Sequence, residues 1–194
     1  MKFGVLAAAF AVSAMIAGGK IAHADGLDFR NTITGDPLDI DSTSPKEGRD
    51  TPAVKKFMET GVDTYVEVPG CLPKGEEIYL ESCSGCHGHI GEGKVGPGLN
   101  DSYWTYPKNG TDKGMFETIF GGAAGMMGPH GQDLTLDDIM HVIAWIRHMQ
   151  KDDVKDAEWF TPEQKKAFKP FNIEEWEKTG RAAAAKEQCK ISGN

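Results

Sequence analysis

The sequence predicts an all-α protein in which a helical middle is flanked by two long, loop-rich extensions. The stretch "LTLDDIMHVIAWIRHM" repeats apolar side chains at helical spacing, and one face holds Ile139, Val142, Ile143 and Ile146. Thr135 can cap this helix, with Asp138 three residues further on. No stretch alternates apolar and polar residues as a strand does, and no repeat is visible. A chain of 194 residues with this pattern suggests one domain with extensions.

The chain opens with an expected export signal at residues 1–24. Lys2 supplies positive charge, "FGVLAAAFAVSAMIAGG" is apolar, and "AHA" at 22–24 offers small residues for cleavage. An uncleaved anchor is the alternative, but these 17 residues fall short of the roughly 20 apolar residues that a spanning helix needs. We therefore expect a mature periplasmic chain that starts near Asp25 and has no membrane span.

The N-terminal extension covers residues 25–70 and is rich in turn-forming residues. One short helix is expected within it, "TPAVKKFMETG", between Pro52 and Gly61. A second helix is expected over 73–82, where a proline and acidic residues precede apolar positions. This second helix would deliver the cysteine motif that follows it.

The middle of the chain alternates loops with helices. Residues 91–110 are dense in glycine and proline and predict a loop. A short helix is expected over 112–120, followed by a glycine-rich loop that carries Met126 and Met127. The expected divisions are a central domain over 71–150 and a C-terminal extension over 151–194.

The charge balance is acidic. Lysine and arginine number 21 against 29 aspartates and glutamates. Cleavage after residue 24 removes Lys2 and Lys20 and no acidic residue, which leaves 19 basic residues against 29 acidic ones and a net charge of −10. An acidic exported protein is a poor nucleic-acid binder, so we expect no such partner. Acidity usually serves solubility, but it also suits electrostatic steering toward a basic protein partner.

The stretch "CSGCHGHI" sets Cys83, Cys86 and His87 in the pattern CxxCH. Three chemistries use this spacing: a redox-active dithiol, half of a zinc site, and covalent attachment of haem c. A thioredoxin-like dithiol would need a βαβ context, and the chain has almost no strand signal. Structural zinc would need further paired ligands, whereas His141 and His148 lie seven residues apart. Haem attachment needs only two thiols and a following histidine, and export agrees with it.

The sixth ligand of the iron then decides the function. An iron held by His87 alone would bind small ligands, whereas histidine with methionine suits electron transfer. Met126 and Met127 lie in a glycine-rich loop, away from any apolar periodicity, unlike Met140 and Met149 on the helix. The remaining histidines are interpreted as surface residues: His89, His130, His141 and His148. The remaining cysteines, Cys71 and Cys189, would suit each other as a disulfide in an oxidising compartment.

Together, CxxCH, "GPGL" at 96–99, the methionine loop and the last amphipathic helix resemble a class I cytochrome c. The resemblance implies that the Pro97 carbonyl accepts the N–H of His87. It also implies a helix crossing where Gly75 and Tyr79 meet Trp145. In that family the methionine ligand commonly precedes the leucine of the last helix by seven positions, which favours Met127 over Met126 when counted from Leu134. Here Met is followed by Gly and then Pro rather than directly by Pro, which leaves Met126 open.

The stretches "FRNTITG", "EGRDTPAVKKFMETG", "IAWIRH" and the block 83–131 are similar to the cytochrome c-L family. This resemblance implies an electron carrier rather than an enzyme, with one covalent haem c. It implies that the donor is a methanol dehydrogenase with pyrroloquinoline quinone (PQQ), and that electrons pass on to a downstream c-type cytochrome or an oxidase. It also suggests a calcium ion near the haem propionates, with no ligands assigned.

Two other hypotheses remain open at this stage. One is a cytochrome that serves another periplasmic dehydrogenase or an oxidase, with identical chemistry. The other is a haem enzyme or gas sensor, which would require an open sixth position on the iron. The single CxxCH excludes a di-haem peroxidase.

Overall fold

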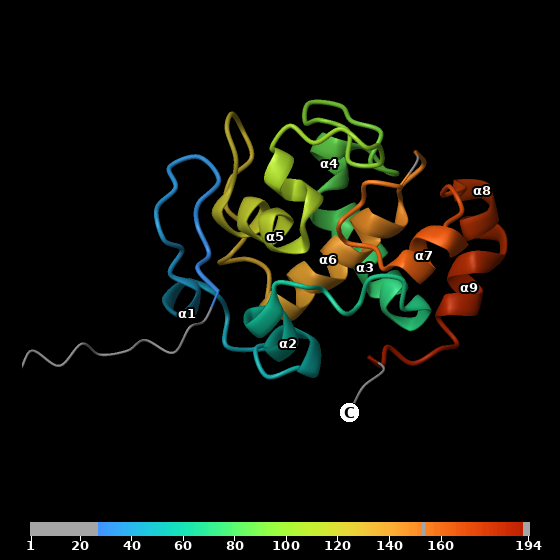
Figure 1. Cartoon of the computed structure of the whole chain (residues 1–194), viewed down its shortest axis with the longest axis horizontal. Helices are drawn as coiled ribbons and strands as arrows, with labels where there is room; N and C mark the ends of the chain where they lie inside the picture. The colour runs from blue at the N-terminus through green and yellow to red at the C-terminus, as the bar shows by residue number, and fades with distance from the viewer. Residues whose placement is uncertain (1–26, 153, 192–194) are drawn as a thin grey trace, which may run out of the picture.

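The computed structural model describes residues 27–152 and 154–191 (Figure 1). The predicted export signal lies outside these residues. Within them the chain is helical and forms no strand, apart from one isolated bridge between Arg30 and Pro37. The all-α prediction is therefore confirmed. The elements are α1 (Ile40–Thr43), α2 (Pro52–Thr60), η1 (Pro69–Cys71), α3 (Leu72–Ser82), α4 (Ser84–His87), η2 (Pro107–Gly110), α5 (Asp112–Gly121), α6 (Leu136–His148), α7 (Pro162–Ala167), α8 (Ile173–Glu175), η3 (Trp176–Gly180) and α9 (Arg181–Ala184).

Helix α6 forms the centre of the core. The Thr135 hydroxyl accepts the N–H of Asp138 at 3.0 Å, and the Asp138 carboxylate accepts the N–H of Thr135 at 3.3 Å. This reciprocal cap satisfies backbone donors that the first helical turn leaves free. The apolar face predicted from periodicity is fully buried, with exposures of at most 3% at Ile139, Val142, Ile143 and Ile146. Met140 and Met149 fill the core as expected.

Helices α3 and α6 cross in close contact (Figure 1). Gly75 permits this approach, because a Cβ atom there would lie 2.2 Å from the carbonyl oxygen of His141 and 3.0 Å from the Cβ of Trp145. Tyr79 and Trp145 are buried on either side of the crossing. Only glycine fits at such a backbone contact. The crossing fixes the end of α3, and with it the start of the cysteine motif.

The N-terminal extension packs beside α5. Helix α2 begins with Pro52 after the Thr51 cap and ends at Gly61, whose left-handed φ of 71° closes the helix. Its Phe57 ring lies 5.1 Å from that of Phe116 on α5, and Phe29 lies 5.2 Å from the same ring. These three aromatic side chains join the extension to the core.

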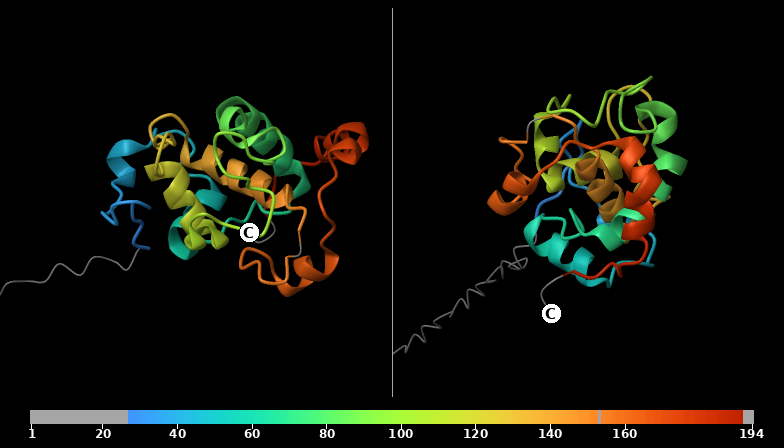
Figure 2. Two further views of the ribbon diagram at one scale, coloured as in Figure 1. Left: turned by 90° about the horizontal axis from the view of Figure 1, so that it is seen from above. Right: turned by 90° about the vertical axis from the view of Figure 1, so that its right-hand side faces the viewer.

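The C-terminal extension contains more helix than its sequence suggested, in α7, α8, the π-helical turn η3 and α9. Figures 1 and 2 place α8 and α9 at the end of the molecule opposite α1. Trp176 of η3 packs on Trp145 of α6 with ring centroids 5.1 Å apart. Arg181 of α9 donates to the carboxylate of Glu76 on α3, with one of the two distances at 2.7 Å. The extension is therefore held against both helices of the central crossing.

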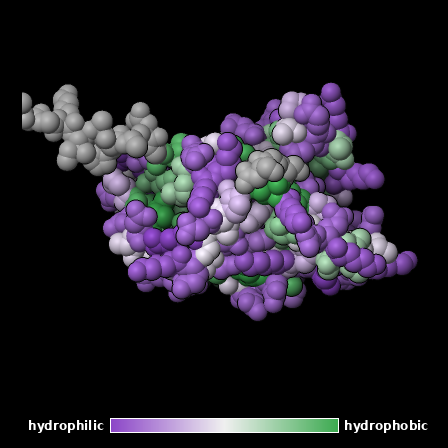
Figure 3. Space-filling view, turned by 90° about the horizontal axis from the view of Figure 1, so that it is seen from below, coloured by the Kyte–Doolittle hydropathy of each residue, from purple (hydrophilic) through white to green (hydrophobic). Residues whose placement is uncertain are grey.

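The face shown in Figure 3 is mostly hydrophilic, with small, separate apolar patches. Among residues 27–152 and 154–191, no helix is long and apolar enough to cross a membrane.

Candidate haem-attachment site

The CxxCH motif forms a single helical turn at the end of α3. The N–H groups of Cys86 and His87 donate to the Cys83 carbonyl at 3.1 and 3.0 Å. This turn, α4, places both sulfurs and the imidazole within one short segment. Cys86 is exposed, Cys83 is partly buried, and both are free thiols, whereas the other two cysteines of the chain are joined to each other. The arrangement leaves two thiols available for covalent attachment.

The environment of Cys83 argues against a redox-active dithiol. Burial, with a smaller contribution from neighbouring Cys86, raises the pKa of the Cys83 thiol to about 12. Thiol–disulfide exchange requires a thiolate, so a buried protonated thiol is a poor nucleophile. The all-helical surroundings of the motif also lack the strand–helix–strand unit that a thioredoxin-like site uses.

His87 is held in one orientation by the loop that follows it. Its Nδ1 lies 2.9 Å from the Pro97 carbonyl oxygen. A carbonyl can only accept, so Nδ1 carries the proton and the Nε2 lone pair is left for a metal. Such an outer hydrogen bond fixes the tautomer of a ligating histidine and raises its basicity. The structure therefore contains the hydrogen bond between His87 and the Pro97 carbonyl that the resemblance implied.

Glycine lets the loop approach the imidazole ring. A Cβ atom on Gly96 would lie 2.7 Å from Cε1 and 2.9 Å from Nδ1 of His87. Two backbone bonds fasten the loop to the motif: Gly96 N–H donates to the Cys86 carbonyl at 2.9 Å, and Gly93 N–H donates to the His87 carbonyl at 2.7 Å. The loop of 91–99 is thus folded onto the motif and contacts one side of the histidine.

The two candidate methionines differ in their surroundings. Met126 is 79% exposed, whereas Met127 is partly buried and packs against the hydrophobic core. The Ala123 N–H donates to the Met127 carbonyl at 3.0 Å and closes a turn. Gly125, which lies between Ala123 and Met127, takes a left-handed φ of 79° in this turn. The turn directs the two side chains to different environments. Met127 has the burial that a thioether ligand requires, and its role stays a prediction.

These residues fit haem c. Two unpaired thiols on one helical turn suit thioether bonds, and the oriented Nε2 of His87 suits the iron. Within the described part of the chain, no group of three or more His, Cys, Asp or Glu side chains is arranged to hold a metal ion. A site that relies on a haem ring needs no such cluster. The calcium ion suggested by the resemblance stays a prediction without assigned ligands.

The remaining histidines divide into exposed and buried ones. His89 is exposed and His130 is partly exposed, as a surface interpretation expects. That interpretation is wrong for His141, which is 4% exposed, and incomplete for His148, which packs among three aromatic rings. Both lie on α6, where the extensions cover the helix. The burial of His141 and the aromatic packing of His148 depend on segments far away in the sequence, so no local pattern indicated them.

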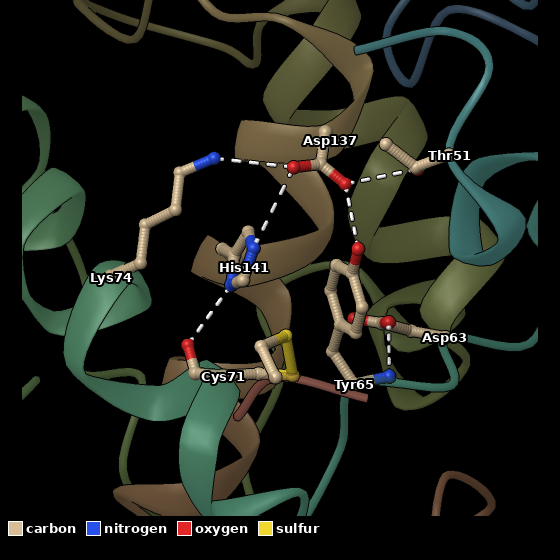
Figure 4. Close-up of a disulfide and its surroundings, with 8 residues drawn as sticks. Thr51, Asp63, Tyr65, Cys71, Lys74, Asp137 and His141 are labelled. Carbon is tan, nitrogen blue, oxygen red and sulfur yellow. Dashed lines mark hydrogen bonds and ion pairs between the residues drawn. A yellow bond between two sulfur atoms is a disulfide. The ribbon is translucent and has the colours of Figure 1, made fainter. Parts of the chain in front are cut away.

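The structure joins Cys71 to Cys189 in a disulfide across a separation of 118 residues, with Cα atoms 4.5 Å apart (Figure 4). The bond fastens the C-terminal extension to the start of α3. Gly70 packs directly against the C-terminal segment that carries Cys189, because a Cβ atom on Gly70 would lie 2.6 Å from the backbone of Gln188. The covalent bond is therefore combined with close backbone packing.

A polar cluster surrounds the disulfide (Figure 4). His141 Nδ1 lies 2.9 Å from the Cys71 carbonyl oxygen, and its Nε2 lies 3.6 Å from the Asp137 carboxylate. The Asp137 carboxylate accepts hydrogen bonds from Tyr65 and Lys74, at 2.8 and 3.2 Å. Burial lowers the pKa of His141, and the nearby Lys74 cation acts in the same direction. The cluster joins the N-terminal extension, α3 and α6, and sequence patterns gave no sign of it.

Comparisons with known proteins agree with this geometry. A family model described as cytochrome C oxidase, cbb3-type, subunit III matches residues 72–146. Cytochrome c-L of Methylorubrum extorquens is 55% identical over 167 residues, which cover 85% of this chain and 81% of that protein.

Two crystal structures are also similar. Cytochrome cL from Hyphomicrobium denitrificans has 77% sequence identity and a TM-score of 0.82, with 86% of this chain and 99% of that chain covered. Cytochrome CL from Methylophaga aminisulfidivorans has 49% identity and a TM-score of 0.72, with 76% and 97% covered. The similarity to both extends well beyond the haem-attachment segment.

Proposed function

Because the chain belongs to the cytochrome c-L family, whose members are c-type electron carriers of methylotrophs, we propose a specific route for its electrons. The chain accepts them one at a time, in the periplasm, from a PQQ-dependent methanol dehydrogenase. It passes them on to a downstream c-type cytochrome or an oxidase. The observation that supports the haem in this proposal is the bond between His87 Nδ1 and the Pro97 carbonyl, beside two free thiols on the same turn. The donor and the acceptor rest on the similarity to cytochrome c-L.

Each residue of the site has a defined task in this proposal. Cys83 and Cys86 hold one haem c through thioether bonds, and His87 binds its iron through Nε2. Met127 supplies the sixth ligand, with Met126 as the alternative. The haem supplies reversible one-electron chemistry, and methionine ligation closes the iron to small molecules. Pro97 keeps the imidazole in place, so little rearrangement is needed when the charge of the site changes.

The domain assignment follows the same logic. We propose that 71–150 forms the haem domain, because this range contains the crossing of α3 and α6 and all the residues of the site. The extensions are 25–70 and 151–194, whose described residues pack around this domain, and 1–24 is removed during export.

Thioether attachment is tested by extraction with acidified acetone. The haem should remain with the purified protein, because covalent bonds to Cys83 and Cys86 survive unfolding. Release of the haem into the solvent would show that the attachment is not covalent. Replacing either cysteine by serine should leave a single, weaker attachment.

The sixth ligand is tested with two methionine variants. Met127→Ala should abolish the weak far-red absorption band that methionine–iron bonding gives in an oxidised c-type cytochrome. Met126→Ala is the matched control and should keep the band, because its side chain points into solvent. Loss of the band in Met126→Ala alone would assign the ligand to Met126. A high-spin spectrum of the parent protein that responds to carbon monoxide would instead favour a gas sensor.

The donor is tested by stopped-flow reduction of the oxidised protein by methanol-reduced dehydrogenase. The net charge of −10 expected for the exported chain should make the rate fall as salt increases, because screening shortens the range of attraction to about 10 Å at 0.1 M salt. A rate that is independent of salt would remove the electrostatic steering. Absence of reduction by this enzyme, with reduction by another periplasmic dehydrogenase, would favour the alternative partner.

A further inference from the structure

Large apolar side chains that stay exposed are concentrated around the proposed haem site. Six such side chains are exposed within the described residues. Four of them lie in the turn of 30–37, the loop of 91–106 or the methionine loop of 122–131: Ile33, Val95, Tyr103 and Met126. Exposed apolar side chains that occur singly are ordinary, but a group of them beside a site is typical of an interaction surface.

Hydrogen bonds connect these three segments. The side-chain amide of Asn31 donates to the carbonyl of Gly121 at 3.0 Å, at the end of α5, where the methionine loop begins. Within that loop, the Ala124 N–H donates to the Tyr106 hydroxyl at 3.1 Å. Figure 1 shows the turn of 30–37 and the methionine loop toward the end of the molecule that carries α1. The turn is therefore continuous with the proposed cofactor site, although it belongs to the N-terminal extension.

The turn of 30–37 is held in one conformation, with a branched apolar residue at its tip. The side-chain oxygen of Asn31 accepts the N–H of Ile33 at 2.9 Å, and the Arg30 N–H donates to the Glu117 carboxylate of α5 at 2.8 Å. Turns usually take glycine, proline or small polar residues rather than isoleucine. Ile33 is 51% exposed and is not part of the hydrophobic core. The fold thus presents an apolar side chain that it does not use, as a preorganised binding contact does.

Acidic side chains surround this apolar tip. Residues 27–41 contain four aspartates and one basic residue, Arg30, which pairs with Asp28 at 2.7 Å. The other three aspartates are exposed: Asp36, Asp39 and Asp41. Asp41 lies 3.7 Å from a guanidinium nitrogen of Arg49, whereas the first two have no ion pair within the described residues. An apolar centre with a polar rim is the usual anatomy of a protein interface, and an acidic rim requires a basic partner surface.

We propose that the turn of 30–37 is a docking element for the electron donor, with Ile33 as its apolar anchor and Asp36 and Asp39 as its acidic rim. This inference rests on the proposed function and names the surface by which the donor is recognised. The partner is the dehydrogenase, through an apolar hollow with basic surroundings, because the donor is the partner toward which the acidic charge steers this chain. A protein that covers Ile33 also reaches the methionine loop, which carries the proposed sixth ligand.

The first experiment is stopped-flow reduction of the oxidised, haem-loaded protein by methanol-reduced dehydrogenase. Ile33→Ala should lower the second-order rate roughly three- to tenfold, as truncation of an interface anchor does. The matched control is Val62→Ala, on the same extension, where Val62 is 54% exposed and lies outside the three segments. This variant should react like the parent. Ascorbate should reduce all three proteins at one rate, because a small reductant needs no docking surface.

The second experiment tests the acidic rim. Asp36→Asn/Asp39→Asn should lower the rate at low salt roughly two- to fivefold and flatten its salt dependence. Asparagine also caps helices, so the cap that Asp39 provides for α1 is kept. The control, Glu174→Gln/Glu177→Gln, removes the same charge at the opposite end of the molecule and should have a smaller effect (Figure 2). Equal effects of the two pairs would show steering by net charge alone and would overturn the assigned rim.

The outcomes separate this inference from the proposed function. If methanol-reduced dehydrogenase does not reduce the parent protein, the proposed function and this inference are both wrong. If it reduces the parent and Ile33→Ala at equal rates, or if Val62→Ala is slowed as much as Ile33→Ala, only the docking role is overturned. Slower oxidation of Ile33→Ala by a downstream cytochrome, with unchanged reduction by the dehydrogenase, would overturn the choice of the donor as partner.

Discussion

The loop of 91–99 and the C-terminal extension both pack against the haem domain, but different interactions hold them. The loop is held by bonds to residues within about ten positions, such as Gly96 N–H to the Cys86 carbonyl and His87 Nδ1 to the Pro97 carbonyl. The extension is held by contacts that span more than a hundred residues, namely the Cys71–Cys189 disulfide and the pair of Arg181 with Glu76. The His87 side of the cofactor site is therefore a local structure, whereas the extension is a long-range clamp.

This difference predicts that a mutation in one region should leave the other region largely unchanged. Damage to the clamp should lower global stability with little change in the iron's ligands. Damage to the loop should change the iron's surroundings with a smaller loss of stability. Each prediction below tests one side of this separation, beginning with the largest expected effect.

The largest effect is expected from removing the disulfide. The variant Cys71→Ser/Cys189→Ser opens a closed loop of 118 residues, which lowers stability by up to about 5 kcal/mol in the chain-entropy model. Guanidinium unfolding followed by circular dichroism measures this loss. The far-red absorption band should persist at room temperature, because the proposed iron ligands, His87 and Met127, lie outside the clamp.

Two results would contradict this prediction. Free thiols at Cys71 and Cys189 in the unreduced native protein, detected by peptide mapping, would show that the bond does not form. Loss of the far-red band in the serine variant, while the protein is still folded, would show that the clamp and the cofactor site are coupled.

The second effect concerns the loop. In Gly96→Ala, the new methyl group would lie within 3.1 Å of three atoms of the His87 ring. The Pro97 carbonyl holds the ring at Nδ1 and the proposed iron would hold it at Nε2, so either the loop or the imidazole must move. Such overpacking typically lowers stability by about 1–3 kcal/mol. The spectrum of the oxidised haem should change together with a modest fall in the thermal midpoint.

The matched control is Gly110→Ala, because a Cβ atom on Gly110 has no neighbour within 4 Å. This variant should keep both the spectrum and the stability of the parent. An unchanged spectrum in Gly96→Ala would show that the loop yields without disturbing His87.

The same contrast explains what the sequence could predict. Helix α2 between Pro52 and Gly61, the Thr135 cap of α6 and the crossing at Gly75 depend on local patterns or on a motif of a known family. These features were correctly predicted, because propensity, capping and periodicity act over a few residues.

The parts that the sequence did not predict depend on distant residues. Burial of His141 requires the N-terminal extension to bring Tyr65 over α6, and the aromatic packing of His148 requires Trp176 to reach it. A histidine on a helix gives no local signal of its partners. A short helical turn such as η3 is stabilised by packing rather than by its own sequence, so propensity alone does not reveal it.

The smallest effect is a pH dependence of folding stability at His141, which donates to the carbonyl of Cys71 beside the disulfide. Burial lowers the pKa of His141 below its ordinary value of 6.5, so the unfolded chain binds a proton there more readily than the folded one. Neutral His141 therefore contributes stability that is fully present above about pH 6.5 and is lost as pH falls toward the folded pKa, by at most about 1.4 kcal/mol per pH unit. Burial raises the pKa values of Asp63 and Asp112, so the folded chain binds protons at these groups more readily than the unfolded one. Their effect on stability is therefore opposite to that of His141, because they favour the folded state as pH falls.

The contribution of His141 is isolated by comparison with His141→Asn, whose amide can still donate to the Cys71 carbonyl but cannot gain a proton. Shared groups such as Asp63 cancel in the difference between the two unfolding free energies. We expect the variant to be less stable at about pH 7 and the gap to narrow as pH falls toward about 5, because only the parent must exclude a proton from the cluster. Parallel stability curves over this range would show that His141 is not linked to folding, and the polar cluster beside the disulfide would then act through packing alone.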